Sequence, residues 1–154
     1  MRVVRDYQGW APNDLLDPEA ESVLAFLDHL STRGLLEEVG EVMARIDKYE
    51  VVYVDVPVGA ASLYLQAGDG WDRVIWTTPP GRGYEWRWDL VRGPKQVSAL
   101  VDGQGVERLT YLGKRRLASD LVADGETLAS SGGLLRGLLR RLVLGLTQRD
   151  QSAL

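Results

Sequence analysis

The sequence predicts one α+β domain over residues 1–154, with two N-terminal helices, a roughly six-stranded antiparallel meander and a C-terminal amphipathic helix packed on the sheet. Apolar residues recur at helical spacing in the first third of the chain, alternate with polar residues in the middle, and return to helical spacing near the end. The links between the expected strands are too short for parallel crossovers, so the strands should pair antiparallel. Residues 1–14 are expected to form an N-terminal arm, and residues 147–154 a frayed polar tail.

The first helix is expected to begin at Pro18 and to end near Gly34. Asp17 is a favourable N-cap residue, Pro18 suits the first helical position, and Gly34 can end the helix in the left-handed conformation. A second helix is expected over residues 35–46, although Gly40 disfavours a helix by about 1 kcal/mol relative to alanine. The apolar stripes of the two helices are Val23, Phe26, Leu27 and Leu30, and then Leu36, Val39, Met43 and Ile46.

A change from helical spacing to strict alternation at Glu50 marks the start of the expected meander. Val52, Val54 and Val56 fall on one face of the first strand. The segment 67–70, Ala-Gly-Asp-Gly, is typical of a hairpin turn. The expected strands cover residues 51–56, a segment around residues 63–65, and residues 71–77, 84–91, 96–101 and 106–112.

The last third of the chain returns to helical character. Residues 115–123 are expected to form a short helix, and residues 125–133 a flexible link. Residues 134–146 are expected to form the final helix, with leucines along one stripe and arginines on the other side. We favour docking of this stripe across the sheet over a position on a membrane surface, because docking buries the same leucines.

Composition excludes several classes of protein. The chain has no cysteine, which rules out disulfides, zinc–thiolate sites, iron–sulfur clusters and thiol catalysis. Its longest apolar stretch, residues 51–65, is interrupted by Asp55, Pro57 and Gly59, so no membrane span is expected. The first residues are charged and lack the apolar run of a signal peptide. We therefore expect a cytoplasmic protein, and the excess of arginine over lysine suggests a bacterial genome rich in GC.

A row of aromatic residues is the most informative feature of the expected sheet. Alternation places Tyr84, Trp86 and Trp88 on one face of their strand, and Trp76 comes from the preceding strand. Such residues fill the core beneath the helices, anchor a protein interface or stack nucleic-acid bases. Burial in the core is the interpretation that general packing favours. An exposed row would form a partner-binding site together with Arg82, which is expected to be exposed in a loop rich in glycine and proline.

Basic residues gather only after the expected sheet. If they converge in space, they can bind phosphate groups or an acidic protein. The net charge of −4 disfavours nonspecific affinity for nucleic acid, and the first 50 residues carry an excess of acidic side chains that can orient a partner. The two basic clusters are Lys114, Arg115 and Arg116, and then Arg136 and Arg140 with Arg141.

Signals of catalysis and of metal binding are weak. His29 is the only histidine, and it lies off the apolar stripe of the first helix without a motif for Ser-His-Asp catalysis. Asp55 would be a candidate acid or base only if its strand buried it, and we expect its face of the sheet to be the wetter one. The sequence therefore predicts no catalytic residue, no metal site and no cofactor. An enzyme that relies on carboxylates alone is the weaker hypothesis.

The sequence thus favours a non-enzymatic protein-interaction module that binds one partner protein, as an inhibitor, an immunity-type protein or a chaperone does. This hypothesis rests on the lack of a catalytic signature and on surplus aromatic residues beside polarised charge. The alternative is a single-stranded nucleic-acid-binding protein that uses Tyr84, Trp86 and Trp88 with nearby arginines. A small-molecule pocket between the sheet and the helices is a third hypothesis. An exposed edge strand or the final helix would also allow a two-fold homodimer.

Overall fold

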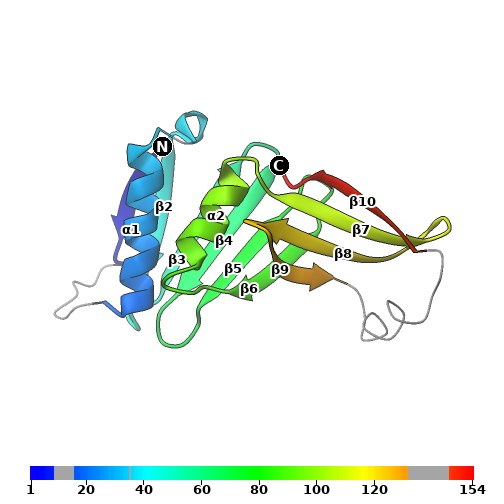
Figure 1. Cartoon of the computed structure of the whole chain (residues 1–154). Helices are drawn as coiled ribbons and strands as arrows, with labels where there is room; N and C mark the ends of the chain where they lie inside the picture. Colours follow the sequence, from blue (N-terminus) through cyan, green and yellow to red (C-terminus); the bar gives the residue numbers. More distant parts are fainter. Residues whose placement is uncertain (9–15, 35, 132–145) are drawn as a thin grey trace.

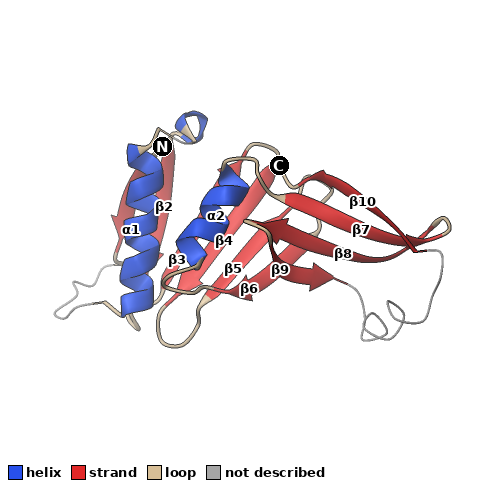
Figure 2. Ribbon diagram, in the orientation of Figure 1, coloured by secondary structure: helices blue, strands red, loops and turns tan. Residues whose placement is uncertain are grey.

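The computed structural model describes residues 1–8, 16–34, 36–131 and 146–154. Over these residues the chain forms two α-helices, one 3₁₀ turn and ten strands in two sheets (Figure 1), so the predicted fold of two N-terminal helices and one six-stranded meander is wrong. Figure 2 shows how strongly strands predominate. The helices are α1 (Pro18–Thr32), η1 (Glu37–Val39) and α2 (Gly93–Val101). The strands are β1 (Arg2–Asp6), β2 (Glu41–Ile46), β3 (Val52–Val58), β4 (Ala61–Ala67), β5 (Arg73–Thr77), β6 (Gly83–Arg87), β7 (Val106–Leu112), β8 (Arg115–Ala123), β9 (Glu126–Ser131) and β10 (Leu146–Ser152).

The first sheet contains six strands in the order β1-β2-β3-β4-β5-β6. Neighbours from β2 to β6 pair antiparallel, as the short links predict, whereas β1 is parallel to β2. The predicted hairpin turn between β4 and β5 is confirmed, and Gly68, Asp69 and Gly70 all adopt positive φ there. Residues 2–6 of the predicted N-terminal arm form β1 because the edge of β2 offers unpaired backbone groups.

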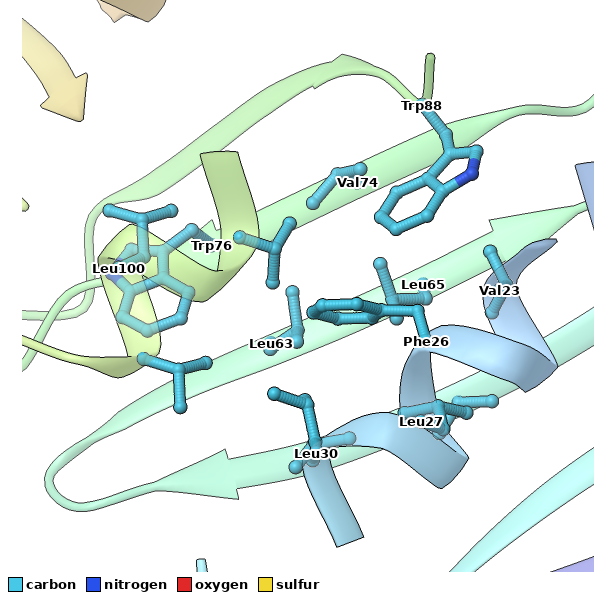
Figure 3. Packing of buried hydrophobic residues seen from close by; sticks show 14 of the residues in the cluster. Val23, Phe26, Leu27, Leu30, Leu63, Leu65, Val74, Trp76, Trp88 and Leu100 are labelled. Carbon is cyan, nitrogen blue, oxygen red and sulfur yellow. The ribbon is translucent and has the colours of Figure 1, made fainter. Parts of the chain in front are cut away.

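Helices α1 and α2 cover one face of the first sheet (Figure 1) and bury an apolar core against it. The first predicted helix is confirmed, with Pro18 in its first turn and its predicted apolar stripe buried. Figure 3 shows Phe26 and Leu30 of α1 packed over Leu63 and Leu65 of β4. Burial of each such side chain stabilises the fold by about 1.5–3 kcal/mol.

The predicted second helix over residues 35–46 is wrong. Its first part forms only the single turn η1, and the residues from Glu41 onward form β2. Gly40 separates the two with φ of 68°, a conformation that ends a helix. The segment from Glu41 onward forms a strand because it pairs with β1 and β3, and the resulting sheet buries every second side chain of the segment. That buried set is Val42, Ala44 and Ile46.

Helix α2 occupies a segment for which the sequence predicts a strand, residues 96–101. Pro94 lies in the first turn, where its missing N–H group is not needed. The preceding strand, predicted to reach residue 91, ends at Arg87 as β6. In a helix of nine residues, helical spacing is easily mistaken for alternation. The buried residues of α2 that show the helical spacing are Gly93, Gln96, Val97, Leu100 and Val101.

The C-terminal part of the described chain forms a second sheet, in the order β10-β7-β8-β9. Residues 115–123 form β8, so the short helix predicted for them is wrong. The predicted link over residues 125–133 contains β9, and the predicted tail over residues 147–154 contains most of β10. Bulges in the β7–β8 and β8–β9 pairings disturb the alternation on which strand prediction depends. The predicted final helix over residues 134–146 lies outside the described residues except for Leu146, the first residue of β10.

A buried carboxylate joins the two sheets. Glu107 of β7 has no exposed surface, and its carboxylate accepts hydrogen bonds from Arg82, Tyr84 and Gln151. Burial raises the pKa of Glu107, but the hydrogen bonds from Arg82, Tyr84 and Gln151 outweigh it, and the net pKa lies below the ordinary value. Burial and the bond to Glu107 raise the pKa of Tyr84 to about 12. The four side chains therefore form a polar cluster that connects β6 and the residue before it to β7 and β10.

Removal of the cation should destabilise this cluster. The substitution Arg82→Met should lower the free energy of unfolding at pH 7 by about 3–5 kcal/mol, because it leaves the Glu107 carboxylate buried without a compensating charge. Urea unfolding followed by circular dichroism measures the change. The matched control is Arg108→Met, which breaks an exposed ion pair with Asp150 at 2.9 Å and should change stability by about 0.5 kcal/mol. Similar losses in the two variants would contradict the role given to Glu107.

The same cluster predicts how stability depends on pH. Because the pKa of Glu107 is lower in the folded chain than in the unfolded chain, its contribution is present above the unfolded value and is lost as pH falls through the folded value. Wild-type protein should therefore lose stability on acidification. In Glu107→Gln this acid-dependent part of the loss should be smaller, as urea midpoints measured from neutral to acidic pH will show.

Candidate functional site

The face of the first sheet that lies opposite α1 and α2 is open in the described part of the chain. Along β2, Glu41, Met43 and Arg45 point to this side and are exposed, and Asp55 of β3 is exposed as well. The alternate residues of the same strands are buried against the helices. An antiparallel sheet with one covered and one open face leaves the open side chains free to contact a ligand.

Strand register arranges the residues of the open face in rows that cross the sheet. Tyr53 of β3 lies opposite Gln66 of β4, Gln66 lies opposite Arg73 of β5, and Arg73 lies opposite Arg87 of β6. Residues that face each other in this way have neighbouring side chains. The adjacent row runs through Asp55, Tyr64, Ile75 and Glu85.

The turn between β4 and β5 positions Trp71 at one end of this face. Gly68 has φ of 115°, and a Cβ atom there would lie 2.7 Å from the carbonyl oxygen of Glu50. The backbone N–H of Trp71 donates to the carbonyl of Gly68 at 3.0 Å, and that of Asp69 donates to the carboxylate of Asp17 at 2.8 Å. Asp17 thus ties the turn to the start of α1. The side chain of Trp71 remains 56% exposed.

Trp71 and the half-buried Trp86 line a hollow of about 520 Å³. The exposed indole of Trp71 offers apolar area to a ligand there, whereas Trp86 lies opposite the buried Val74 in the sheet and packs against the core. Its other lining residues are Gly70, Asp72, Arg73, Glu85 and Arg87.

The charged residues of this hollow are compensated within the chain. Arg73 lies 3.3 Å from the carboxylate of Glu85, and Arg87 lies 3.1 Å from the carboxylate of Asp72. Ion pairs near the surface contribute about 1 kcal/mol or less to stability. Their main consequence here is that the hollow carries little net charge, so a ligand should be recognised largely by apolar contact.

A second hollow of about 450 Å³ adjoins the first, since Arg87 lines both. It carries Leu90 and Val91, which are 46% and 71% exposed. Asp89 holds their loop by accepting hydrogen bonds from the backbone N–H groups of Arg92 at 2.7 Å and Val91 at 2.9 Å, and these bonds lower the pKa of Asp89. We name the following residues the Trp71 surface: Trp71, Arg87, Leu90 and Val91.

The structure places the predicted partner-binding residues in the core, against it, or in the cluster between the two sheets. Trp76, Tyr84 and Trp88 are buried, which is the arrangement expected of aromatic residues that fill the core. Trp86 is half-buried and packs against the same core, since it lies opposite the buried Val74. Arg82 is only 22% exposed and is bound within the cluster between the sheets, so the expectation that its loop exposes it is wrong.

The described basic residues of the predicted site do not lie on the Trp71 surface. Lys114, Arg115 and Arg116 are exposed at the hairpin between β7 and β8. Arg136 and Arg140 lie outside the described residues. Two further expectations are confirmed, because the one histidine is exposed on α1 and Asp55 is exposed on the open face.

The site residues predicted from the sequence do not include Trp71, Leu90 and Val91. The predicted strand extends to residue 91 and so places Leu90 and Val91 in a strand instead of in a loop. A local signal was present in Asp89, because an aspartate that precedes a helix start by a few residues often bonds to the backbone N–H groups that follow it. Exposure of Trp71, by contrast, depends on the packing of the whole β4–β5 turn.

Other classes of site receive no support from the described residues. Within the ranges that the structure describes, no group of three or more histidine, cysteine, aspartate or glutamate side chains is arranged to hold a metal ion. No helix among them is both long enough and apolar enough to cross a membrane. Comparisons of the chain with protein-family models, curated proteins and solved structures find no match. Function must therefore be inferred from the surface itself.

The turn that carries Trp71 should tolerate no side chain at Gly68. The substitution Gly68→Ala should lower the free energy of unfolding by about 3 kcal/mol, because the added methyl group meets backbone and the positive φ is strained. Gly59→Ala is the matched control, since Gly59 also has a positive φ but has no atom within 4 Å of the added methyl group. It should cost about 1 kcal/mol. Equal losses in urea unfolding would contradict this account of the turn.

The Trp71 surface should contribute little to folding. Trp71→Ala should change the free energy of unfolding by about 0.5 kcal/mol or less, because the exposed indole leaves no cavity when removed. Trp88→Ala should cost about 3–5 kcal/mol, because Trp88 is buried with its ring 5.5 Å from that of Phe26. Chemical unfolding of both variants tests the contrast. A large loss on removal of Trp71 would show that it serves packing instead of recognition.

Proposed function

We propose that this chain is a protein-interaction module that binds one partner protein through the Trp71 surface. The observation that carries the proposal is the exposure of Trp71, Leu90 and Val91 in two hollows that Arg87 lines in common, with their turns held by hydrogen bonds. Tryptophan and arginine are enriched among the residues that dominate binding energy in protein interfaces. An inhibitor, an immunity-type protein and a chaperone-like protein would each use such a surface.

The distribution of charge favours a protein over a single strand of nucleic acid as the partner. Proteins that bind single strands combine stacking platforms with a cationic groove. On the open face Arg73 and Arg87 are each paired with a carboxylate, and Arg45 lines a pocket with several acidic side chains. The aromatic side chains of Tyr84 and Trp88, which the nucleic-acid hypothesis uses, are buried.

Affinity capture from cells that produce the chain tests the proposal. Immobilised wild-type protein should retain one partner, and the double variant Trp71→Ala/Val91→Ser should retain it at least about thirty-fold less well, the effect of losing one dominant interface residue. Binding of the identified partner is then measured by titration calorimetry with the purified proteins.

Tyr49→Ala is the matched control, because Tyr49 is 63% exposed in the turn before β3 and lies outside the Trp71 surface. It should bind the partner like wild type. Equal retention by all three proteins, or no specific partner at all, would refute the proposal. Salt-dependent binding of single-stranded oligonucleotides with quenching of tryptophan emission would favour the nucleic-acid alternative instead.

A further inference from the structure

A separate pocket opens on the face of the first sheet that lies opposite α1 and α2, over β2, β3 and β4. Its volume is about 460 Å³, which falls within the range of about 300–1,000 Å³ of pockets that hold a small ligand. We name it the tyrosine pocket. The lining residues that carry a charge or an aromatic ring are Glu41, Arg45, Asp47, Tyr53, Asp55 and Tyr64.

Two half-buried tyrosine rings form its aromatic wall. The hydroxyl of Tyr53 donates to the carboxylate of Asp47 at 3.0 Å, and burial together with this bond raises the pKa of Tyr53. Burial and the nearby Asp55 raise the pKa of Tyr64. Both phenols are therefore neutral near pH 7. Neutral aromatic rings that line a pocket attract cations through their electron-rich faces.

The charge of the pocket is net negative. Three carboxylates face one guanidinium, that of Arg45. The Asp47 carboxylate is occupied by hydrogen bonds from the tyrosine hydroxyl and from two backbone N–H groups. Glu41 and Asp55 form no ion pair with any other described residue. Asp55 lies directly opposite Tyr64 across β3 and β4, so an uncompensated carboxylate and an aromatic ring stand side by side.

We propose that the tyrosine pocket receives an arginine side chain of the partner protein, with its guanidinium against Tyr64 and Tyr53 and its charge near Asp55 and Glu41. A planar guanidinium stacks on an aromatic ring and donates hydrogen bonds to a carboxylate at the same time, which an ammonium group on a flexible stem does less well. The charge complementarity between a net negative pocket and a cationic side chain selects this occupant. This inference rests on the proposed function, because it assigns chemistry to the same partner.

The tyrosine pocket and the Trp71 surface are close enough for one partner to reach both. Tyr53 begins the row that continues through Gln66 and Arg73 to Arg87, which belongs to the Trp71 surface. This row spans three strand spacings, or about 14 Å. An ordinary protein interface of about 800 Å² on each side covers such a distance. An apolar anchor at one end and a cation at the other would set the orientation of the partner.

The pocket can be tested without the partner. The probe is N-acetyl-L-arginine methylamide, titrated into ¹⁵N-labelled full-length chain while backbone amide shifts are recorded. Saturable shifts should appear at Tyr53, Asp55 and Tyr64, with millimolar affinity. The matched probe is N-acetyl-L-citrulline methylamide, which has the same shape without the charge and should bind at least about fivefold more weakly. Absence of saturable shifts, or equal binding of the two probes, would overturn the proposal.

Two variants locate the binding. Asp55→Asn should weaken the arginine probe by about fivefold, because it removes an exposed but uncompensated charge. Asp124→Asn removes an exposed carboxylate from the β8–β9 turn and should leave binding unchanged. Probe binding that Asp55→Asn does not weaken would overturn the assignment. If an altered amide spectrum shows that Asp55→Asn perturbs the fold, Glu41→Gln replaces it in this test. It should also weaken binding of the arginine probe by about fivefold.

The result separates this inference from the proposed function. If a partner binds through the Trp71 surface while the arginine probe does not bind, the tyrosine pocket assignment falls and the proposed function stands. If the probe binds and no partner is recovered, the proposed function falls and the cation site stands.

Discussion

Every other part of this structure depends on the burial of a single face of the first sheet. That face receives α1 and α2, and the second sheet packs beside them, so Leu121 of β8 enters the same core as Phe26 of α1 and Leu63 of β4. Apolar burial is not directional, and it does not by itself fix how two sheets meet. The polar contacts do so: the Glu107 cluster joins β7 to β6, and the indole N–H of Trp76 donates to the carbonyl of Ala153 at 2.9 Å.

Helices α1 and α2 both pack on one face of the first sheet, so the opposite face of that sheet is available to bind a partner. The residues of this opposite face are held in rows by the hydrogen bonds of the sheet, so their spacing is fixed before any ligand arrives. The turns at the end of β4 and after β6 add apolar residues that no described element covers. A partner would therefore meet a preorganised surface, and little binding energy would be lost in ordering it.

The two parts of the open face differ in how their charges are compensated. Around Trp71 each arginine has a carboxylate partner within the chain, so apolar area dominates. Around Tyr64 the carboxylates of Asp55 and Glu41 have no such partner among the residues that the structure describes, so a cation is favoured. One row of paired residues, from Tyr53 to Arg87, connects the two regions, while the turn before β5 supplies the Asp72 carboxylate that pairs with Arg87. Specificity for one partner would come from the combination of the two.

Local signals in the sequence determined α1, the antiparallel order of β3 to β5 and the glycine turn before Trp71. A helix start at Pro18 and a turn at Gly68 follow from backbone conformations that few other residues adopt as well. Sequence also determined that Asp55 lies on the face opposite Val52, Val54 and Val56, because alternation assigns the residues of a strand to its two faces.

Only the tertiary structure decided the rest. Residues 41–46 became a strand because β1 and β3 pair with them, and residues 115–123 became β8 for the same reason, since strand formation depends on partners that are distant in sequence. The same dependence decided which aromatic residues are buried and which are exposed: Trp76 and Trp88 are buried in the core, while Trp71 is exposed in the turn between β4 and β5. Alternation predicts which residues of a strand share a face. Which of the two faces is covered depends on where the helices and the second sheet pack.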